Sequence, residues 1–200
     1  MDPMSPSRSL LRAFVLTAML PALAAPLAAQ QTQGPPTAVI VSGPELGEMA
    51  PEFTLPWASA DSIGPAGEPF RLAHRRGKVV VLAFYPRDFT SGCTAEMRTF
   101  ADQYQTMFGD GVEVVGISID SLPTHVRFAQ SLKLPFLLLS DPGQDVARRY
   151  GSSGTNGNMR RTVYVIDREG RVAYRNLRFG ALDPKAYDEL KSAVGQARGG

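Results

Sequence analysis

The sequence predicts an α/β fold in which a central mixed sheet is flanked by helices. Short apolar runs rich in β-branched residues lie at 79–84, 112–119 and 136–139, and segments with helical periodicity separate them. This alternation implies right-handed crossovers and a parallel core. Two further strand-like runs near the C-terminus are joined by a short turn and followed by a last helix, so they add antiparallel strands to the sheet.

The predicted domain begins near Leu46 with a pair of short strands. Phe53 and Leu55 alternate with polar neighbours between two prolines, which is typical of an edge strand. Residues 58–69 are rich in Gly, Pro and Asp and predict turns. Residues 70–72 are expected to form the second arm of a hairpin with the first strand.

The run at 79–84 is predicted to be a buried strand that stops at Pro86, because proline has no N–H to donate within a sheet. A short polar loop follows, and helix-compatible sequence begins at Cys93. Apolar residues then recur at steps of three and four as far as Phe108. This spacing predicts one amphipathic helix, closed by Gly109.

Alternating strands and helices continue to the end of the chain. After the strand at 112–119, Pro123 suits the first turn of a helix. The packing residues expected on that helix are Val126, Phe128, Ala129 and Leu132. The elements predicted next are a strand at 136–139, a turn at 141–143, a short helix at 145–150, a loop at 151–159, a strand at 162–166, a turn at 167–170, a strand at 172–175 and a helix from 183 onward. This order is the thioredoxin-like pattern.

The N-terminal residues predict a secretory signal peptide. Arg8 and Arg12 precede and enter an apolar run that ends in small residues, the pattern of a basic n-region, an apolar core and a cleavage site. Cleavage is expected after Ala29, with Ala24 and Ala25 as alternative ends. The expected organisation is a signal peptide at 1–29, a linker or N-terminal arm at 30–45 and the thioredoxin-like domain at 46–200.

Export follows from that interpretation, to a periplasm or to the outside of the cell. The alternative is an uncleaved segment that anchors the protein in the membrane. Two prolines and many alanines weaken a spanning helix, which favours cleavage and no stable membrane association afterwards.

Charge and histidine content argue against several classes of function. The formal net charge is +2 and no run of Lys and Arg stands out, so nucleic acid is not an expected partner. His74 and His125 are the only histidines, and neither has the acidic or cysteine spacing of a metal site. Both are expected on the surface or at a helix end, and no metal or cofactor is predicted.

Cys93 is the single cysteine of the chain, so no internal disulfide can form. An unpaired thiol in an exported protein suggests a reactive group or an intermolecular partner. The alternative, a buried thiol acting as a small hydrophobe, fits poorly with the polar Thr-Ser-Gly sequence before it. Reactivity needs the thiolate, and the first turn of a helix supplies free N–H groups and a positive dipole end.

Neighbouring residue types could complete a site around this thiol. Thr90 can donate a hydroxyl hydrogen bond or help to cap the helix. Pro86 would wall one side and keep water out. Arg160 or Arg161, at the start of a later strand, would reach the same end of the sheet.

The string from Pro86 to Cys93 has the form PxxxTxxC, and the surrounding text FYPRDFTSGCTAEM resembles the bacterioferritin comigratory protein or peroxiredoxin Q branch of the peroxiredoxins. These belong to the alkyl hydroperoxide reductase and thiol-specific antioxidant superfamily. The resemblance extends from about residue 46 to residue 190 and includes GEMAPEFTLP, VVGISIDS and LLLSDPGQDVARRYG. It implies a peroxidase that reduces hydrogen peroxide and organic hydroperoxides through a cysteine sulfenic acid.

The resemblance also implies a role for each site residue. Cys93 would be the peroxidatic cysteine, and Thr90 would orient thiolate and peroxide. Arg161 would polarise the O–O bond, with Arg160 as the alternative. The remaining implied roles are shielding of the sulfenate by Pro86 and retention of the arginine by Glu96, whose alternative interpretation is a solvated helix charge.

One position departs from the pattern of this branch. Many members carry a resolving cysteine five residues after the first, where this chain has Arg98. The expectation is therefore a one-Cys cycle in which an external thiol, such as a thioredoxin-like protein or a small thiol, reduces the sulfenic acid of Cys93. A monomer or weak dimer is expected.

Other functions of the same fold remain as alternatives. A thiol–disulfide oxidoreductase would need a CxxC motif and a copper-delivery protein a CxxxC motif with histidine, and the chain has neither. A peroxide sensor with little turnover is compatible with the Pro, Thr, Cys and Arg set.

Overall fold

A computed structural model describes residues 42–154 and 156–199 of the chain. The elements, in chain order, are β1 (Thr54–Leu55), β2 (Trp57–Ala58), β3 (Phe70–Arg71), the 3₁₀ helix η1 (Leu72–Arg75), β4 (Val79–Phe84), α1 (Ser91–Asp102), α2 (Tyr104–Met107), β5 (Val112–Ser118), α3 (Leu122–Leu132), β6 (Leu137–Ser140), α4 (Asp145–Arg149), β7 (Thr162–Ile166), β8 (Val172–Asn176) and α5 (Pro184–Gly199). The predicted strands and helices from residue 79 onward are all present, with bounds shifted by a few residues and one helix divided.

The main sheet has six strands in the order β2-β6-β5-β4-β7-β8. β4, β5 and β6 are parallel, and the helices α1, α2 and α3 lie in the crossovers between them. β7 pairs antiparallel with β4, and β8 pairs antiparallel with β7. β1 and β3 form the expected separate hairpin pair. The predicted mixed sheet flanked by helices is confirmed.

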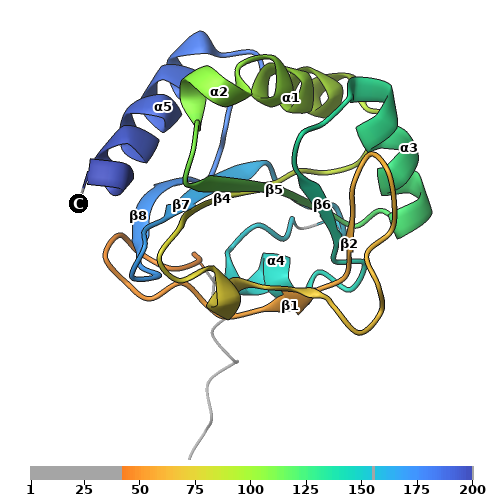
Figure 1. The fold of residues 1–200 in the computed structure, drawn as a ribbon, viewed down its shortest axis with the longest axis horizontal. Coiled ribbons are helices and arrows are strands. Elements are labelled where there is room, and N and C mark those ends of the chain that lie inside the picture. Colours follow the sequence, from red (N-terminus) through yellow and green to blue (C-terminus); the bar gives the residue numbers. More distant parts are fainter. Residues whose placement is uncertain (1–41, 155, 200) are drawn as a thin grey trace, which may run out of the picture. The chain divides into compact units, whose positions relative to one another are not determined.

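Alternating residues of the central strand β4 point into two cores. Val81 and Ala83 belong to the core shared with α1, α2, α3 and α5, whereas Leu82 and Phe84 belong to the core shared with α4, β1 and β3. Figure 1 shows α1, α2 and α5 on one side of the sheet and α4 and β1 on the other. All residues of β4 are buried, as expected for a strand covered on both faces. The chain leaves the carboxyl end of β4 through a short turn and then enters α1, which contains Cys93.

Two features of the fold differ from the prediction. β2 pairs with β6 at the edge of the main sheet, although it has only two residues and lies beside a proline in a turn-rich region. The single helix predicted up to Phe108 is divided, because Gln103 has a non-helical backbone between α1 and α2. The apolar spacing could not reveal this break, since Phe100 and Met107 on either side of it enter the same core.

The predicted signal peptide at 1–29 and most of the predicted linker at 30–45 lie outside the described residues. Residues 42–45, the end of that linker, contact the domain: Pro44 is buried, and its carbonyl oxygen accepts a hydrogen bond from Arg175. Among the helices that the structure describes, none has the length and apolar character needed to cross a membrane.

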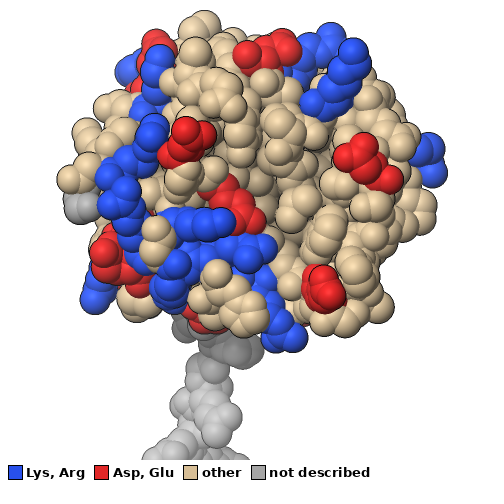
Figure 2. Space-filling view, in the orientation of Figure 1, with Lys and Arg blue, Asp and Glu red and all other residues tan. Residues whose placement is uncertain are grey.

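Basic residues that are scattered in the sequence gather on part of the surface. Figure 2 shows Lys and Arg side chains clustered toward the lower left of one face, with Asp and Glu among them. Ion pairs neutralise part of the basic charge of the domain, as between Arg76 and Glu52 and between Arg75 and Glu113. The sequence did not reveal this clustering because the contributing residues are not consecutive.

Candidate active site

Cys93 lies where the central strand passes into the first helix. β4 ends at Phe84, a short turn follows, and α1 begins at Ser91, two residues earlier than predicted. Cys93 is therefore the third residue of α1, within the turn whose backbone N–H groups have no partner inside the helix. Its side chain is fully buried, with 0% exposure. The position places the sulfur in the positive field of the helix start.

Arg161 reaches this sulfur because of the strand register. Thr162, the first residue of β7, pairs with Phe84, the last residue of β4, so the residue before β7 lies beside the loop after β4. Arg161 Nη2 donates a hydrogen bond to Cys93 Sγ at 3.3 Å. A Cβ atom at Gly92 would come within 3.2 Å of the same nitrogen, so the glycine leaves room for the guanidinium.

Glu96 holds the other side of this guanidinium. It lies one turn after Cys93 on α1, and its carboxylate forms an ion pair with Arg161 Nη1. The Glu96 side chain is fully buried, and within the described residues its Oε1 atom has no hydrogen-bond partner. Burial raises the pKa of Glu96 to about 7, although Arg161 acts to lower it.

Arg161 remains positively charged in this environment. Burial acts to lower the pKa of Arg161, but the neighbouring Glu96 carboxylate and Cys93 sulfur outweigh it and the pKa is raised. A half-buried guanidinium thus stays positive between a sulfur atom and a carboxylate. Such a group stabilises negative charge that develops on either neighbour.

The structure separates Arg161 from the alternative arginine. Arg160 is exposed, and its Nε atom donates to the carbonyl of Ser153 at 3.0 Å, in the loop before β7. Only Arg161, of these two, contacts Cys93. The solvated interpretation of Glu96 is wrong, because this side chain is buried.

Two further predicted residues lie in the turn before the helix. Thr90 occupies the cap position of α1, but its hydroxyl donates to the carbonyl of Arg87 at 3.1 Å; no capping bond is formed, and no bond to Cys93 Sγ is found among the described residues. Pro86 follows Tyr85 at the end of β4 and is half-buried. The turn thus brings Pro86 and Thr90 to the start of α1, without a direct contact from the hydroxyl to the sulfur.

Matches to known proteins agree with this geometry. The model of the AhpC/TSA family matches residues 46–175. The chain belongs to this family. It is 39% identical over 136 residues to a Coxiella burnetii protein named peroxiredoxin bcp, covering 64% of this chain and 85% of the relative. It is 41% identical over 134 residues to the chloroplastic peroxiredoxin Q of Sedum lineare, covering 65% and 68%.

The fold agrees with solved peroxiredoxin structures as well. The crystal structure of peroxidoxin BcpB from Mycobacterium tuberculosis superposes with a TM-score of 0.65 at 29% identity, covering 76% of this chain and 97% of that chain. The resemblance found in the sequence to the peroxiredoxin Q and bacterioferritin comigratory protein branch is confirmed, and so is the thioredoxin-like fold.

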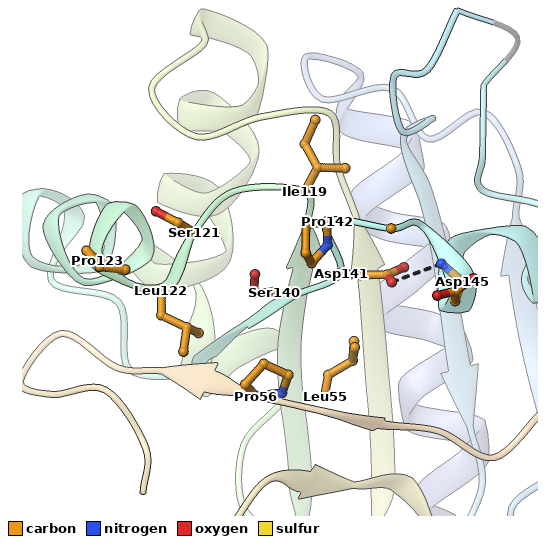
Figure 3. A pocket seen from close by; sticks show the side chains of 11 residues that line it. Leu55, Pro56, Ile119, Ser121, Leu122, Pro123, Ser140, Asp141, Pro142 and Asp145 are labelled. Carbon is orange, nitrogen blue, oxygen red and sulfur yellow. Dashed lines mark hydrogen bonds between the residues drawn. The ribbon is translucent and has the colours of Figure 1, made fainter. Parts of the chain in front are cut away.

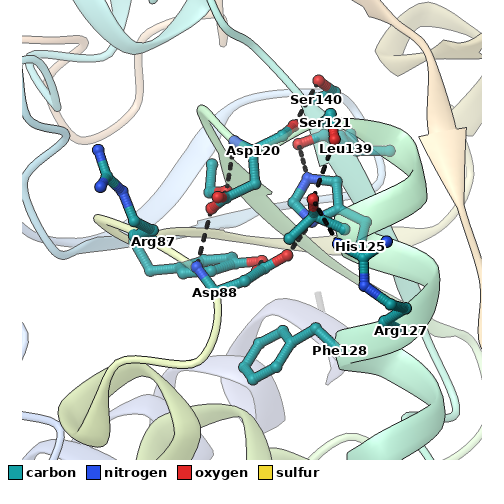
Figure 4. Close-up of polar contacts among 12 residues, drawn as sticks. Arg87, Asp88, Asp120, Ser121, His125, Arg127, Phe128, Leu139 and Ser140 are labelled. Carbon is teal, nitrogen blue, oxygen red and sulfur yellow. Dashed lines mark hydrogen bonds and ion pairs between the residues drawn. The ribbon is translucent and has the colours of Figure 1, made fainter.

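A buried polar network beneath the peroxiredoxin loop was missed by sequence reasoning. His125 was expected at the surface or at a helix end, but its side chain on α3 is fully buried. Its Nδ1 atom lies 2.8 Å from Asp88 Oδ2, and Tyr85 donates its hydroxyl to Asp88 Oδ1 at 2.7 Å. Figure 4 shows Asp88 and His125 between the loop and α3, with Asp120 beside them.

The spacing of apolar residues along α3 could have indicated that His125 is buried. His125 stands three and four residues before Phe128 and Ala129, so it lies on the same face of α3 as these two buried residues. Val126, which was expected to pack, is only half-buried. A histidine on the apolar face of a helix needs polar partners, and Asp88 inside the loop motif supplies one.

One surface pocket lies apart from the sulfur. It has a volume of about 600 Å³ and lies between the loops that follow β5 and β6. Figure 3 shows Leu55, Ile119 and Leu122 around it. Its lining does not include Cys93 or Arg161. Within the described residues, no group of His, Cys, Asp and Glu side chains is arranged to hold a metal ion.

Proposed function

We propose that the protein is a thiol peroxidase in which Cys93 reduces hydroperoxides and an external thiol restores it. One observation carries the proposal: Arg161, fixed by Glu96, donates a hydrogen bond to the sulfur of a cysteine in the first turn of a helix. The match to the AhpC/TSA family supports the same chemistry.

In the first step the Cys93 thiolate donates an electron pair to the terminal oxygen of a hydroperoxide ROOH. An S–O bond forms while the O–O bond breaks, and the released RO⁻ takes up a proton and leaves as an alcohol, or as water when the substrate is hydrogen peroxide. Negative charge moves from sulfur to the leaving oxygen. Arg161 is placed to stabilise the charge at the start of this transfer and to attract the peroxide to the sulfur.

Supporting roles follow from position. Thr90, at the cap of the same helix, would turn its hydroxyl away from the Arg87 carbonyl and offer it to the peroxide. Pro86, half-buried at the end of β4, limits access to the sulfenate from that side. Glu96 keeps the guanidinium in place.

The second half of the cycle requires another molecule. Cys93 is the only cysteine, and the position five residues later is the exposed Arg98. The reductant thiol attacks the sulfenic sulfur, so an S–S bond forms, the S–O bond breaks and water leaves. A second thiol then releases Cys93 and forms the disulfide of the reductant. We propose a thioredoxin-like protein or a small thiol as this reductant, with the enzyme as a monomer or weak dimer.

We propose further that the protein acts after export, in the periplasm or outside the cell. The basis is the basic, apolar and small-residue pattern that ends near Ala29. Sequencing the N-terminus of protein from fractionated cells tests it: export with cleavage predicts a chain that begins near residue 30. An intact Met1 in the membrane fraction would contradict cleavage.

Stopped-flow mixing with hydrogen peroxide tests the peroxidase. The wild-type chain should form one sulfenic acid per molecule at a second-order rate far above that of free cysteine, and Cys93→Ser should form none. A matched control is Arg98→Ser, which changes an exposed residue of the same helix and should leave the rate unchanged. A wild-type rate close to the free-thiol value contradicts the proposal.

A further inference from the structure

The two ring nitrogens of His125 both face hydrogen-bond acceptors. Nδ1 lies 2.8 Å from Asp88 Oδ2, and Nε2 lies 3.2 Å from the backbone carbonyl oxygen of Leu139 on β6. A carbonyl oxygen cannot donate, so Nε2 must carry a proton. A neutral ring would then present a lone pair from Nδ1 to the carboxylate, which is repulsive.

The contact at Nδ1 therefore contains a proton of its own. With this proton on the ring, Nδ1 donates to Asp88 Oδ2 and both ring nitrogens have an acceptor. Asp88 Oδ1 already accepts the hydroxyl proton of Tyr85, and burial together with the Asp88 charge raises the pKa of that tyrosine, which keeps it a donor. The arrangement is a buried imidazolium–carboxylate pair with donors on both carboxylate oxygens.

This pair joins the loop of Cys93 to helix α3. Asp88 lies in the turn between β4 and α1, and its backbone N–H donates to Asp120 Oδ2 at 2.8 Å. The next residue, Phe89, has a φ of 60°, a strained conformation for an aromatic residue, and its side chain is 53% exposed. Its ring packs edge-on against Phe128 of α3 at a centroid distance of 5.0 Å. A strained turn keeps its shape only when such contacts hold it.

We propose that the Asp88–His125 pair is a positioning element that holds the Pro86–Thr90 turn, and with it Cys93, in the reactive arrangement. The inference rests on the proposed function because the reactive arrangement is defined by peroxide attack at Cys93.

Other titratable or charged side chains near the Asp88–His125 pair come from the elements that pack against it. Tyr85 at the end of β4 bonds to Asp88, and Asp120 after β5 accepts from both the Asp88 N–H and the hydroxyl of Ser118. On α3, the exposed Arg127 donates to the hydroxyl of Thr124.

Variants at Asp88 test the positioning role, because they leave a neutral histidine rather than a buried unpaired carboxylate. Asp88→Ala should slow sulfenic acid formation by hydrogen peroxide about tenfold or more, since small displacements of reacting groups cost large factors in rate. Asp88→Asn should recover most of that loss, because the amide can accept from Tyr85 and donate to a neutral Nδ1. His74→Ala, a change at the other and exposed histidine, should leave the rate unchanged.

The protonation state is measured separately, by ¹⁵N NMR of the imidazole in the His74→Ala chain, where His125 is the only histidine. Two protonated nitrogens at neutral pH are expected, and addition of Asp88→Asn should leave one. An unprotonated nitrogen in the chain that retains Asp88 would overturn the proton-holding pair. An Asp88→Ala rate equal to that of wild type would overturn the positioning role.

The two hypotheses fail in different ways. If the wild-type chain itself reacts no faster than free cysteine, the proposed function fails, whereas the NMR result still tests the pair. If the wild type reacts fast and Asp88→Ala reacts equally fast in a folded protein, as judged by circular dichroism, the positioning inference fails and the peroxidase stands.

Discussion

Replacement of Glu96 by Gln should make the stability of the protein less dependent on pH. Burial raises the pKa of Glu96 from 4.5 to about 7 in the folded chain. A group whose folded pKa lies above its unfolded value contributes stability that is fully present below the unfolded pKa and is lost as pH rises through the folded pKa. The relevant window for Glu96 therefore runs from about pH 4.5 to about pH 7.

The size of the stability change follows from the difference between the unfolded and folded pKa values of Glu96. At about 1.4 kcal/mol for each pH unit, the wild-type chain should lose about 3 kcal/mol of unfolding free energy from Glu96 between pH 4.5 and pH 7. The group is fully buried, so solvent screening does not reduce this figure. Glu96→Gln keeps the shape and an acceptor for Arg161 but does not titrate.

Urea unfolding at a series of pH values between 4.5 and 8 measures the difference between the two proteins. The wild type should lose stability relative to Glu96→Gln by about 3 kcal/mol across the series, with most of the change complete near pH 7. Glu189→Gln, on the exposed surface of α5, is the matched control: it retains Glu96, so its stability should fall with pH as that of the wild type does. A difference between wild type and Glu96→Gln that stays constant from pH 4.5 to 8 would refute the assignment of a raised pKa.

Two further predictions concern the site and its support. Arg161→Ala should lower the rate of sulfenic acid formation by a factor of about 10²–10³, the usual cost of removing a charge-stabilising donor, whereas Arg160→Ala should change it less than about twofold; stopped-flow mixing with hydrogen peroxide compares them, and the reverse order would reassign the arginine. Gly116→Ala should destabilise the chain by about 1–3 kcal/mol, because the added Cβ would lie 2.7 Å from Leu138 Cδ2 and 3.1 Å from the Tyr85 ring. Urea unfolding measures this loss of stability, and an unchanged midpoint would show that the Leu138 side chain and the Tyr85 ring can move aside without cost.

The sequence was sufficient for those parts of the site that are close together in the chain. Pro86, Thr90 and Cys93 lie within eight consecutive residues, and the strand before them and the helix after them are strongly patterned. Arg161 was predicted together with Arg160, since sequence spacing gives the end of the sheet but not the direction of each side chain. The pairing of Phe84 with Thr162 decides between them.

The buried polar groups were harder to predict because their partners come from separate elements. His125 has no metal-binding spacing, and its partners are a carboxylate 37 residues earlier and a backbone carbonyl 14 residues later. Every residue has a backbone carbonyl, so the sequence does not indicate which carbonyl His125 contacts. The break at Gln103 was missed for a related reason: apolar spacing reports which face is buried and continues across a local change of backbone.

In the proposed peroxidase, a rise in pH should act in opposite directions on the reactivity of Cys93 and on the stability that Glu96 contributes. Attack on peroxide needs a deprotonated sulfur, which alkaline solution favours. Glu96, however, is fully buried and is accommodated best in its neutral form, so the stability of the fold falls as pH rises toward about 7. Rising pH therefore activates the nucleophile while it lowers the stability of the fold, so peroxide attack should be fastest at a pH above the one at which the protein is most stable. In Glu96→Gln, where this side chain does not titrate, the rise in rate with pH should remain while the loss of stability disappears. An equal loss of stability toward pH 7 in wild type and Glu96→Gln would assign that loss to a group other than Glu96.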